Sequence, residues 1–350
     1  MADPNSLPEI AAIVAQNFAN MHQALQAPML DSWSITKNQL VKQKLSTFNL
    51  DGGHRVYLGE HLKNARPTTT ENTYIELPKN FLNNGFIPSD EKSIFLLTNN
   101  DIAQDINTYL RFYNNYPQHL FVVWDWDAQH WVGMSTILAM NCDVYVSACS
   151  ENIYLLSQFN PVMLGPVFIG AHQWTRDFIF RNFDVLLEAR TDEPLGQHGY
   201  YANYPKRNRA ISTVTKTFPT VGFATNAYKD KDDLTNLREW AAHKTHFVAP
   251  VLGGVPIRVY NALITGGIPI LPAFYRSLPE SPLFDNIPVY YDTSDLLNFE
   301  ELHRIALRKF DEGGIAGVIS RITSAMSIHH IDFACQEITS RLKSLQKVTE

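Results

Sequence analysis

The sequence predicts an α/β protein built from two parallel β-sheets, each covered by helices on both faces. Short apolar runs that end in polar residues recur along the chain, and segments with a helical pattern separate them. Strands that are buried on both faces read as continuous apolar runs, and a helix between consecutive strands makes those strands parallel. With 350 residues, the chain is long enough for two such domains.

The first 50 residues have a helical pattern. Ile10, Ile13, Val14, Phe18 and Met21 follow one another at i, i+3, i+4, i+8 and i+11, which is one stripe of a 3.6-residue period. This predicts a helical extension ahead of the first strand.

The first domain contains three predicted strands with helices between them. The strands are "SIFLLT" (93–98), "HLFVVW" (119–124) and "DVYVSA" (143–148), and the helices span 101–112 and 133–141. The same alternation of apolar runs and helical segments predicts a second domain. Its expected strands are 183–189, 220–225, 245–250 and 268–273, and its expected helices are 206–217, 232–242 and 256–265.

Glycine and proline cluster in "MLGPVFIGAHQW", near 165–175, and we expect the domain boundary there. The predicted units are a first domain over 1–168, a second domain over 169–325 and a C-terminal helix over 326–350. Two parallel-sheet domains joined in this way form a cleft where the carboxyl ends of their strands face each other. Open α/β sheets bind ligands at that edge.

The composition narrows the class of function. The net charge is −6 with lysine and arginine dispersed, so we expect no nucleic-acid partner, because such binding needs a basic face. Three cysteines without a ligand spacing predict neither a disulfide framework nor a zinc cluster. The N-terminus does not resemble a signal peptide, and no apolar run reaches the ~18 residues of a membrane span. We therefore expect a soluble cytoplasmic protein.

The stretch "GGVPIRVYNALITGGIPILP" (253–272) predicts an anion site. Pro256 suits the first position of a short helix, which Gly266 and Gly267 end with a left-handed turn. Gly253 and Gly254 let a ligand approach the backbone closely. Unpaired amides, the positive end of the helix dipole and Arg258 together suit a phosphate or pyrophosphate. A plain crossover with glycines serving only tight turns remains the alternative.

The same stretch, with "F-V-A-P" before it, resembles the donor-binding region of GT-B glycosyltransferases, and most closely exostosin-like and spore-maturation-type members. The resemblance covers roughly residues 90–280. It implies two Rossmann-like parallel-sheet domains facing a cleft, with the second domain binding a nucleotide-sugar. Where many members have a glutamate that holds the donor ribose, this chain has Asn261. An amide brings no charge, so a donor with an unusual nucleotide or an acidic sugar, such as a CMP-activated one, becomes an option.

The segment 188–210, "EARTDEPLGQHGYYANYPKRNRA", resembles the GT-B loop whose basic residues steady the leaving phosphate. Arg207 and Arg209 would then neutralise charge that grows as the glycosidic bond breaks. The donor-binding candidates from this resemblance and from the glycine-rich stretch are Arg190, His198, Arg207, Arg209, Gly253, Gly254, Arg258 and Asn261. A solvated charged loop that opens a helix is the alternative.

The segment "FVVWDWDAQHW" (121–131) ends a predicted buried strand with Asp125, Asp127 and His130. A carboxylate or imidazole at the carboxyl end of a strand suits a general base for an acceptor hydroxyl. A retaining enzyme would instead use a carboxylate of the second domain, such as Glu188 or Asp192. Asp125-Trp-Asp127 also matches the metal-chelating DxD of GT-A transferases.

The sequence thus predicts a cytoplasmic GT-B glycosyltransferase that moves a sugar from a nucleotide-sugar donor to a glycan or lipid-linked acceptor. Bacterial surface-polysaccharide synthesis is the setting that the resemblance implies. No cofactor and no essential divalent metal are expected, and peripheral membrane association stays open. The alternatives are a metal-dependent GT-A-type transferase using Asp125 and Asp127, and a non-catalytic protein that binds a nucleotide or sugar.

Overall fold

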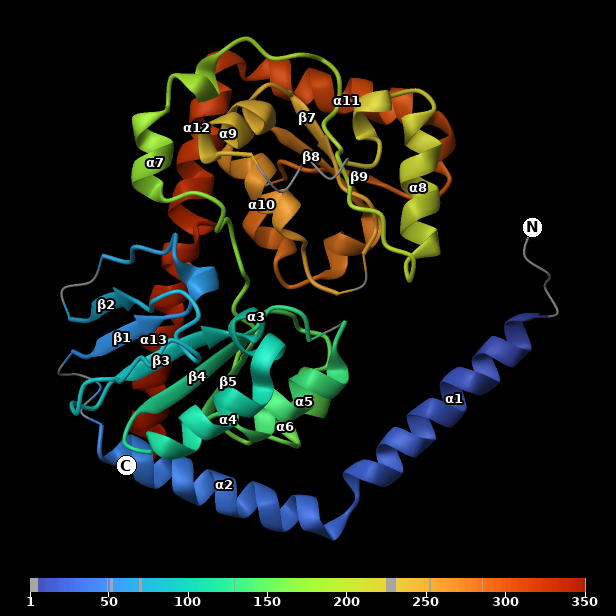
Figure 1. The fold of residues 1–350 in the computed structure, drawn as a ribbon. Helices are drawn as coiled ribbons and strands as arrows, with labels where there is room; N and C mark the ends of the chain where they lie inside the picture. Colours follow the sequence, from blue (N-terminus) through green and yellow to red (C-terminus); the bar gives the residue numbers. More distant parts are fainter. Residues whose placement is uncertain are drawn as a thin grey trace.

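The computed structural model describes residues 6–349, apart from 49, 51–52, 69–70, 129, 225–230, 252 and 285. Two α/β domains lie one against the other, and two long N-terminal helices run along and away from the first of them (Figure 1). Within the described part of the chain, no helix is long and apolar enough to cross a membrane.

Six parallel strands form the sheet of the first domain, in the order β2-β1-β3-β4-β5-β6. They are β1 (Arg55–Leu58), β2 (Thr73–Glu76), β3 (Ile94–Thr98), β4 (Leu120–Asp125), β5 (Val144–Ser147) and β6 (Met163–Leu164). The predicted strands 93–98, 119–124 and 143–148 are confirmed as β3, β4 and β5. The sequence did not indicate the outer strands β1, β2 and β6, because they are short and β2 is half exposed.

Helices cover both faces of this sheet. One face packs against α3 (Asn99–Ile102), α4 (Ile106–Asn115), α5 (Val132–Met140) and α6 (Ile153–Ser157). The other face packs against α2 (Pro28–Ser46) and the last helix, α13 (Ile331–Thr349), through residues such as Val41, Leu45, Cys335 and Ile338. The C-terminal helix therefore completes the core of the first domain, although almost the whole second domain separates the two in the sequence.

The second domain has a three-stranded parallel sheet, β7-β8-β9. Its strands are β7 (Thr245–Phe247), β8 (Ile268–Pro272) and β9 (Val289–Tyr291). Its helices are α7 (Arg176–Arg181), α8 (Pro205–Thr215), α9 (Asp233–Ala241), α10 (Ile257–Ile264), α11 (Phe299–Glu312) and α12 (Gly314–Ile328). The predicted strands 245–250 and 268–273 and the helices 206–217, 232–242 and 256–265 are confirmed, with small shifts at their ends.

Two predicted strands of this domain, 183–189 and 220–225, are wrong. Val185–Leu187 and Pro219–Val221 are single 3-10 turns, and residue 225 lies outside the described residues. The segment 191–198 lies beside β7 instead, through the parallel bridges Thr191 to His243 and Leu195 to His246. Pro194 has no backbone N–H to donate, so this edge forms isolated bridges rather than a regular ladder.

Two crossing segments join the domains side by side. Ala171, on the way into the second domain, pairs with His330, on the way back into the first. The Ala171 amide donates to the His329 carbonyl at 2.6 Å, and the Ile331 amide donates to the Ala171 carbonyl at 3.0 Å. The predicted α/β architecture of two parallel-sheet domains, with additional helices at both ends of the chain, is confirmed.

Candidate functional site

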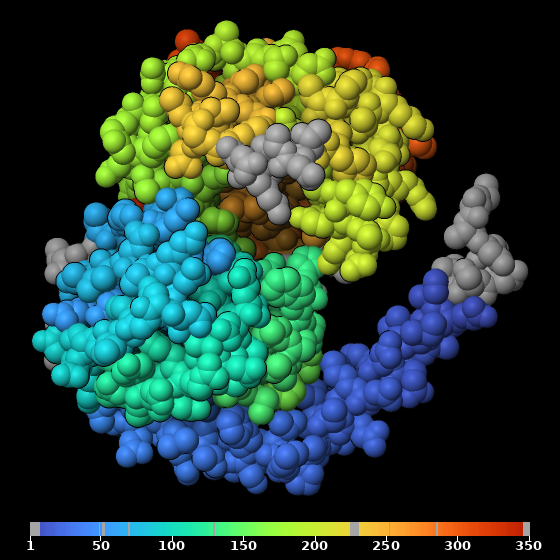
Figure 2. Space-filling model, viewed as in Figure 1, coloured from blue at the N-terminus to red at the C-terminus, as the bar shows by residue number. Residues whose placement is uncertain are grey.

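A cavity of about 860 Å³ lies between the domains, within the size range of small-molecule sites. Both domains line it, and Figure 2 shows the hollow between them. The carboxyl end of β4 reaches the cavity from one side, and the segments that follow β7 reach it from the other. The cavity therefore forms at the edge where ligands bind in open α/β sheets.

The start of α10 opens into this cavity. Gly254, Val255, Pro256, Ile257 and Arg258 all line it. Pro256 is the N-cap, with ψ 148°, and not the first helical residue as predicted. The Val259 amide donates to the Pro256 carbonyl at 2.9 Å, and the Ile257 amide ahead of it can bind an anion at the positive end of the helix.

Gly254 lies in a close-packed position. A Cβ atom there would lie 3.1 Å from the Cys149 Sγ of the first domain. A larger residue there would require the loop or Cys149, which follows β5, to move by a few tenths of an ångström. Gly253 does not line the cavity, and its φ of 97° makes the turn before Gly254.

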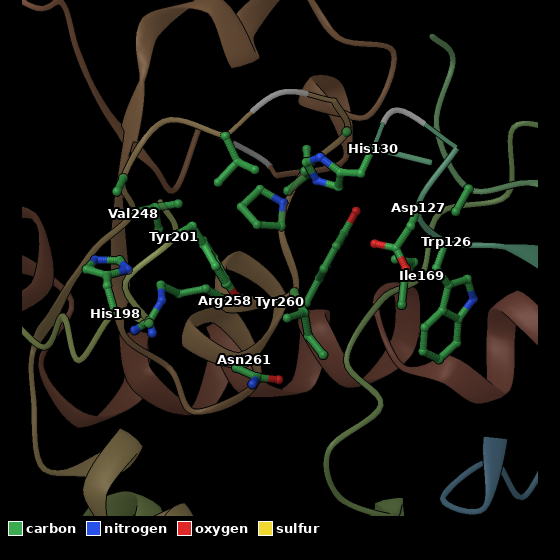
Figure 3. Close-up of a pocket in the computed structure, with 18 of the residues that line it drawn as sticks. Trp126, Asp127, His130, Ile169, His198, Tyr201, Val248, Arg258, Tyr260 and Asn261 are labelled. Atoms are coloured by element: carbon green, nitrogen blue, oxygen red, sulfur yellow. The ribbon is translucent and has the colours of Figure 1, made fainter. Parts of the chain in front are cut away.

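Three nitrogen-bearing side chains of the second domain gather near α10. The Arg258 guanidinium lies over the Trp240 ring at 5.1 Å, and its Nη2 donates to the Gln197 carbonyl at 3.0 Å. Arg207 on α8 donates from Nη1 to the Gly199 carbonyl at 2.6 Å, and its Nε has no hydrogen-bond partner within the described part of the chain. Figure 3 shows Arg258 and His198 together on one side of the cavity.

His198 is neutral at this site. Burial, followed by the nearby charges of Arg258 and Arg207, holds its imidazole pKa well below the ordinary value. Its Nε2 has no hydrogen-bond partner among the residues that the structure describes. The His198 backbone is held because its amide donates to the Gly222 carbonyl at 3.1 Å and its carbonyl accepts from Ala224 at 2.9 Å, and its ring packs edge to face with Phe247 at 5.7 Å between centroids. The wall thus offers two guanidinium groups and one uncharged imidazole.

Asn261 lines the cavity one turn into α10. Its Nδ2 donates to the Gln173 Oε1 at 2.8 Å, which fixes the orientation of the amide. Its Oδ1 is buried and finds no donor among the described residues. An acceptor atom that is held in this way suits a ligand hydroxyl.

The opposite wall carries Asp127, just after β4. Its Oδ2 accepts from Asn99 Nδ2 at 2.9 Å and from Asn100 Nδ2 at 3.5 Å. Figure 3 shows the Asp127 carboxylate across the cavity from Arg258, with Tyr260 between them. This arrangement places a hydrogen-bonded carboxylate opposite a cationic wall.

His130 spans the cavity mouth with Tyr204 of the second domain. The Tyr204 hydroxyl and the His130 Nδ1 are hydrogen-bonded, and the two rings meet edge to face with centroids 5.4 Å apart. Burial lowers the His130 pKa, although the Asp127 carboxylate opposes that shift. His130 is therefore neutral near pH 7, and its Nδ1 can accept a hydrogen bond from the Tyr204 hydroxyl.

Asp125, a predicted base, does not reach the cavity. It is 1 % exposed and accepts from the Tyr145 hydroxyl at 2.6 Å and from the Asp127 amide at 3.0 Å. Burial raises its pKa. Asp125 therefore organises the strand end that presents Asp127, and the DxD pair of the GT-A alternative does not face one common point.

Other predicted site residues also lie outside the cavity. Glu188 and Arg209 are exposed. Asp192 is 68 % exposed and pairs with Lys244 at 2.7 Å. Arg190 donates to the Leu186 and Thr265 carbonyls, both at 2.7 Å, and so joins parts of the second domain to one another. The part of this segment from Thr191 to Leu195 lies beside β7, and only residues from Gln197 onward reach the cavity.

Several lining residues were not predicted from the sequence. Gln173, which orients Asn261, comes from the crossing segment and carries no sequence signal. Tyr201 and Tyr204 lie within the predicted charged segment, where the prediction rests on the charged side chains alone. The aromatic run "YYANY" just before a helix is the signal that could have indicated them.

No group of three or more metal-ligating side chains occurs among the described residues. Asp127 binds two asparagine amides rather than a second carboxylate. The donor set present around the cavity does not match the oxygen-rich shell that Mg²⁺ or Ca²⁺ requires.

Solved trehalose-6-phosphate synthases are similar to this chain. The α,α-trehalose 6-phosphate synthase from Burkholderia multivorans has a TM-score of 0.46 and 9% sequence identity, covering 73% of this chain and 71% of that one. A trehalose-6-phosphate synthase solved to study glycosyl transfer with retention has a TM-score of 0.44 and 10% identity, covering 83% of this chain and 93% of that one. No family model and no curated protein matches the chain. These neighbours are not the exostosin-like or spore-maturation-type proteins that the sequence resembles.

Glu280 lies directly behind the α10 loop. Its Oε1 would be 3.6 Å from a Cβ at Gly254, and its Oε2 has no hydrogen-bond partner in the described ranges. Burial, with a contribution from the Glu151 carboxylate, raises the Glu280 pKa from 4.5 to about 7. With this pKa, the carboxyl is about half protonated at neutral pH, so it repels an anion bound in front of the loop less than a full carboxylate would.

The raised pKa predicts a pH-dependent stability. The folded state binds more protons than the unfolded state between pH 4.5 and about 7, so the free energy of unfolding falls as pH rises through this window. This fall in the free energy of unfolding amounts to up to roughly 3 kcal/mol, and we expect Glu280→Gln to abolish it. Urea unfolding at pH 5 and pH 8 measures it, with the exposed Glu188→Gln as the matched control. Equal pH slopes in wild type and Glu280→Gln would contradict the assignment.

Proposed function

We propose that the chain is a GT-B glycosyltransferase that transfers a sugar from a nucleotide-sugar donor to a hydroxyl of a glycan or lipid-linked acceptor. One observation supports it above the others. A carboxylate, Asp127, faces a wall formed by the α10 amides, Arg258 and Arg207 across a single cavity between two parallel-sheet domains. Transfer of a sugar away from an anionic leaving group needs a base for the acceptor hydroxyl on one wall and positive charge for the leaving group on the other.

In this proposal the second domain binds the donor. The diphosphate lies at the start of α10, where Arg258 and Arg207 offset the charge that grows on the leaving group. The uncharged His198 Nε2 provides a further hydrogen bond to the phosphates or the sugar. Asn261 accepts a hydrogen bond from a ribose hydroxyl through the Oδ1 that Gln173 holds in place.

The first domain presents the acceptor. Asp127 takes the proton of the acceptor hydroxyl as its oxygen bonds to the anomeric carbon. The bond from that carbon to the phosphate oxygen breaks, and the nucleoside diphosphate leaves with the electron pair. This step inverts the anomeric centre. The carboxylates considered for a retaining route, Glu188 and Asp192, lie outside the cavity.

We further propose that the reaction takes place in the cytoplasm, during synthesis of a bacterial surface polysaccharide, without an essential divalent metal. The resemblance of the sequence supports the setting, and the amide-bound state of Asp127 supports the independence from metal. Transfer measured with and without EDTA tests the second point. A loss of activity that Mg²⁺ or Mn²⁺ restores would favour a metal-dependent enzyme.

A thermal-shift screen of UDP, GDP, dTDP and CMP tests donor binding. A nucleotide that binds only the folded state at about 100 times its Kd stabilises it by about 2.7 kcal/mol, which raises Tm by several degrees. We expect one nucleotide to exceed the others and Arg258→Ala to abolish that shift. If none of the four nucleotides raises Tm, the proposal of a nucleotide-sugar donor is contradicted. Donor binding without transfer to any glycan acceptor would favour the non-catalytic alternative.

A further inference from the structure

The helix α1 (Ser6–Leu25) projects from the body of the protein without a covering element (Figure 1). Every residue from Pro8 to Asn20 is exposed, on all sides of the helix. None of the three hydrophobic cores includes a residue of α1. A lone helix of this length is only marginally stable in water, because most helical stability in proteins comes from packing of an apolar face.

α1 nevertheless carries an apolar stripe. Ile10, Ile13, Val14 and Phe18 are exposed by 53 %, 61 %, 61 % and 59 %, and the partly exposed Met21 continues the same face. Residues at this spacing lie on one side of a helix, as an amphipathic helix requires. A contiguous apolar stripe that the molecule itself does not cover indicates a surface for binding.

The charges of α1 exclude one occupant and favour another. The helix contains Glu9 and no lysine or arginine, whereas helices that lie on anionic membranes are rich in basic residues. Glu9 lies in the first turn and His22 in the last. Two copies in antiparallel orientation bring the acidic end of each helix to the basic end of the other, and their helix dipoles oppose one another.

The stripe is also self-complementary in that orientation. An antiparallel pair whose two-fold axis passes between Asn17 and Phe18 places Ile10 of one copy beside Leu25 of the other, Val14 beside Met21, and Asn17 beside Phe18. Asn17 lies three residues from Val14 and four from Met21, so it belongs to the same face and lies next to the two-fold axis.

We propose that α1 is a dimerisation helix, which pairs antiparallel with α1 of a second copy of the chain through the stripe Ile10, Ile13, Val14, Asn17, Phe18 and Met21. A contact of two helices about 30 Å long is small for a stable interface. The dimer therefore dissociates at low protein concentration. Because α1 lies outside both domain cores, dimerisation leaves the cavity between the domains intact.

Sedimentation velocity of the full chain from 1 to 100 µM tests the proposal. We expect a concentration-dependent dimer, and a monomer throughout for Val14→Glu/Phe18→Glu. The matched control is Ala12→Glu, on the opposite face of the same helix, which should dimerise like the wild type. Wild type that stays monomeric, or a dimer that survives Val14→Glu/Phe18→Glu, overturns the proposal. Flotation of the monomer with phosphatidylglycerol vesicles, abolished by the same double change, would also overturn it.

Cysteine cross-linking tests the orientation, since the three native cysteines are buried. Asn17→Cys should form a disulfide-linked dimer under mild oxidation, and Ala12→Cys should not. Ile10→Cys alone should remain unlinked, while Ile10→Cys/Leu25→Cys links. Efficient self-linking of Ile10→Cys would show a parallel pair and overturn the antiparallel arrangement. The nucleotide-induced Tm shift should be the same in all these variants and in the wild type. Failure of the dimerisation proposal can then be distinguished from failure of the proposed transferase function.

Discussion

Arg207→Ala is expected to lower kcat/KM for sugar transfer by roughly 100-fold or more, because it removes a buried cation from the wall that faces the leaving group. Arg207 lies against the Tyr201 ring at 4.5 Å, and its guanidinium is held by the Gly199 carbonyl. Its position is therefore set before a ligand binds. The loss should appear in both kcat and donor affinity, measured by steady-state kinetics and calorimetry.

Arg209→Ala is the matched control for this experiment. Arg209 is two residues further along α8, about 200° around the helix, and it is exposed. Its removal takes away the same charge from the protein as a whole without changing the cavity, so activity should stay within about twofold of wild type. Arg207→Lys separates charge from geometry, since lysine keeps the charge but not the planar fork. Equal losses in Arg207→Ala and Arg209→Ala would show that only net charge matters.

Asp127→Asn is expected to lower kcat by about 10²–10⁴-fold, the usual contribution of a positioned general base. The substitution keeps the size of the side chain, and its amide oxygen can still accept from Asn99. We therefore expect donor affinity and Tm to remain close to wild type. Transfer assays, nucleotide titration and thermal unfolding of the same preparation measure the three quantities.

Asp192→Asn serves as the control, because Asp192 is exposed and pairs with Lys244 away from the cavity. Asp125→Asn should behave differently from both. It breaks the hydrogen bond from Tyr145 inside the core, so its main effect should be a lower Tm. Full activity in Asp127→Asn would remove the base from the proposed mechanism and leave His130 as the remaining candidate on that wall.

The fold could be predicted where local sequence dictates it. The apolar runs that became β3, β4, β5, β7 and β8 are buried throughout, so their composition alone identifies them. The two wrong strands of the second domain, 183–189 and 220–225, show the limit. Val185, Leu186 and Val221 are buried by 3-10 turns that pack on the core, and composition does not distinguish such a turn from a short strand.

The sequence predicted only part of the candidate site, and the reason is geometric. The sequence brings Arg207 and Arg209 together, and also Asp125 and Asp127. Residues two apart point about 200° from each other in a helix, and Asp127 lies beyond the end of β4, where the alternation of a strand no longer sets its direction. Which member faces the cavity depends on where the rest of the protein packs. Gln173 could not be identified, and neither could the pairing of Tyr204 with His130, because the partners in each pair lie far apart along the chain.

The sequence by itself determined the α/β class, the glycine-bracketed helix near residue 256 and the amphipathic pattern of the N-terminal helix, since each follows from interactions between residues close in the chain. Only the tertiary structure decided that α13 completes the core of the first domain, that Arg258, Arg207 and His198 meet opposite Asp127, and that the stripe on α1 stays exposed. These relations join segments far apart in the chain. Their free energy comes from the burial of surfaces that exist only once both domains have folded.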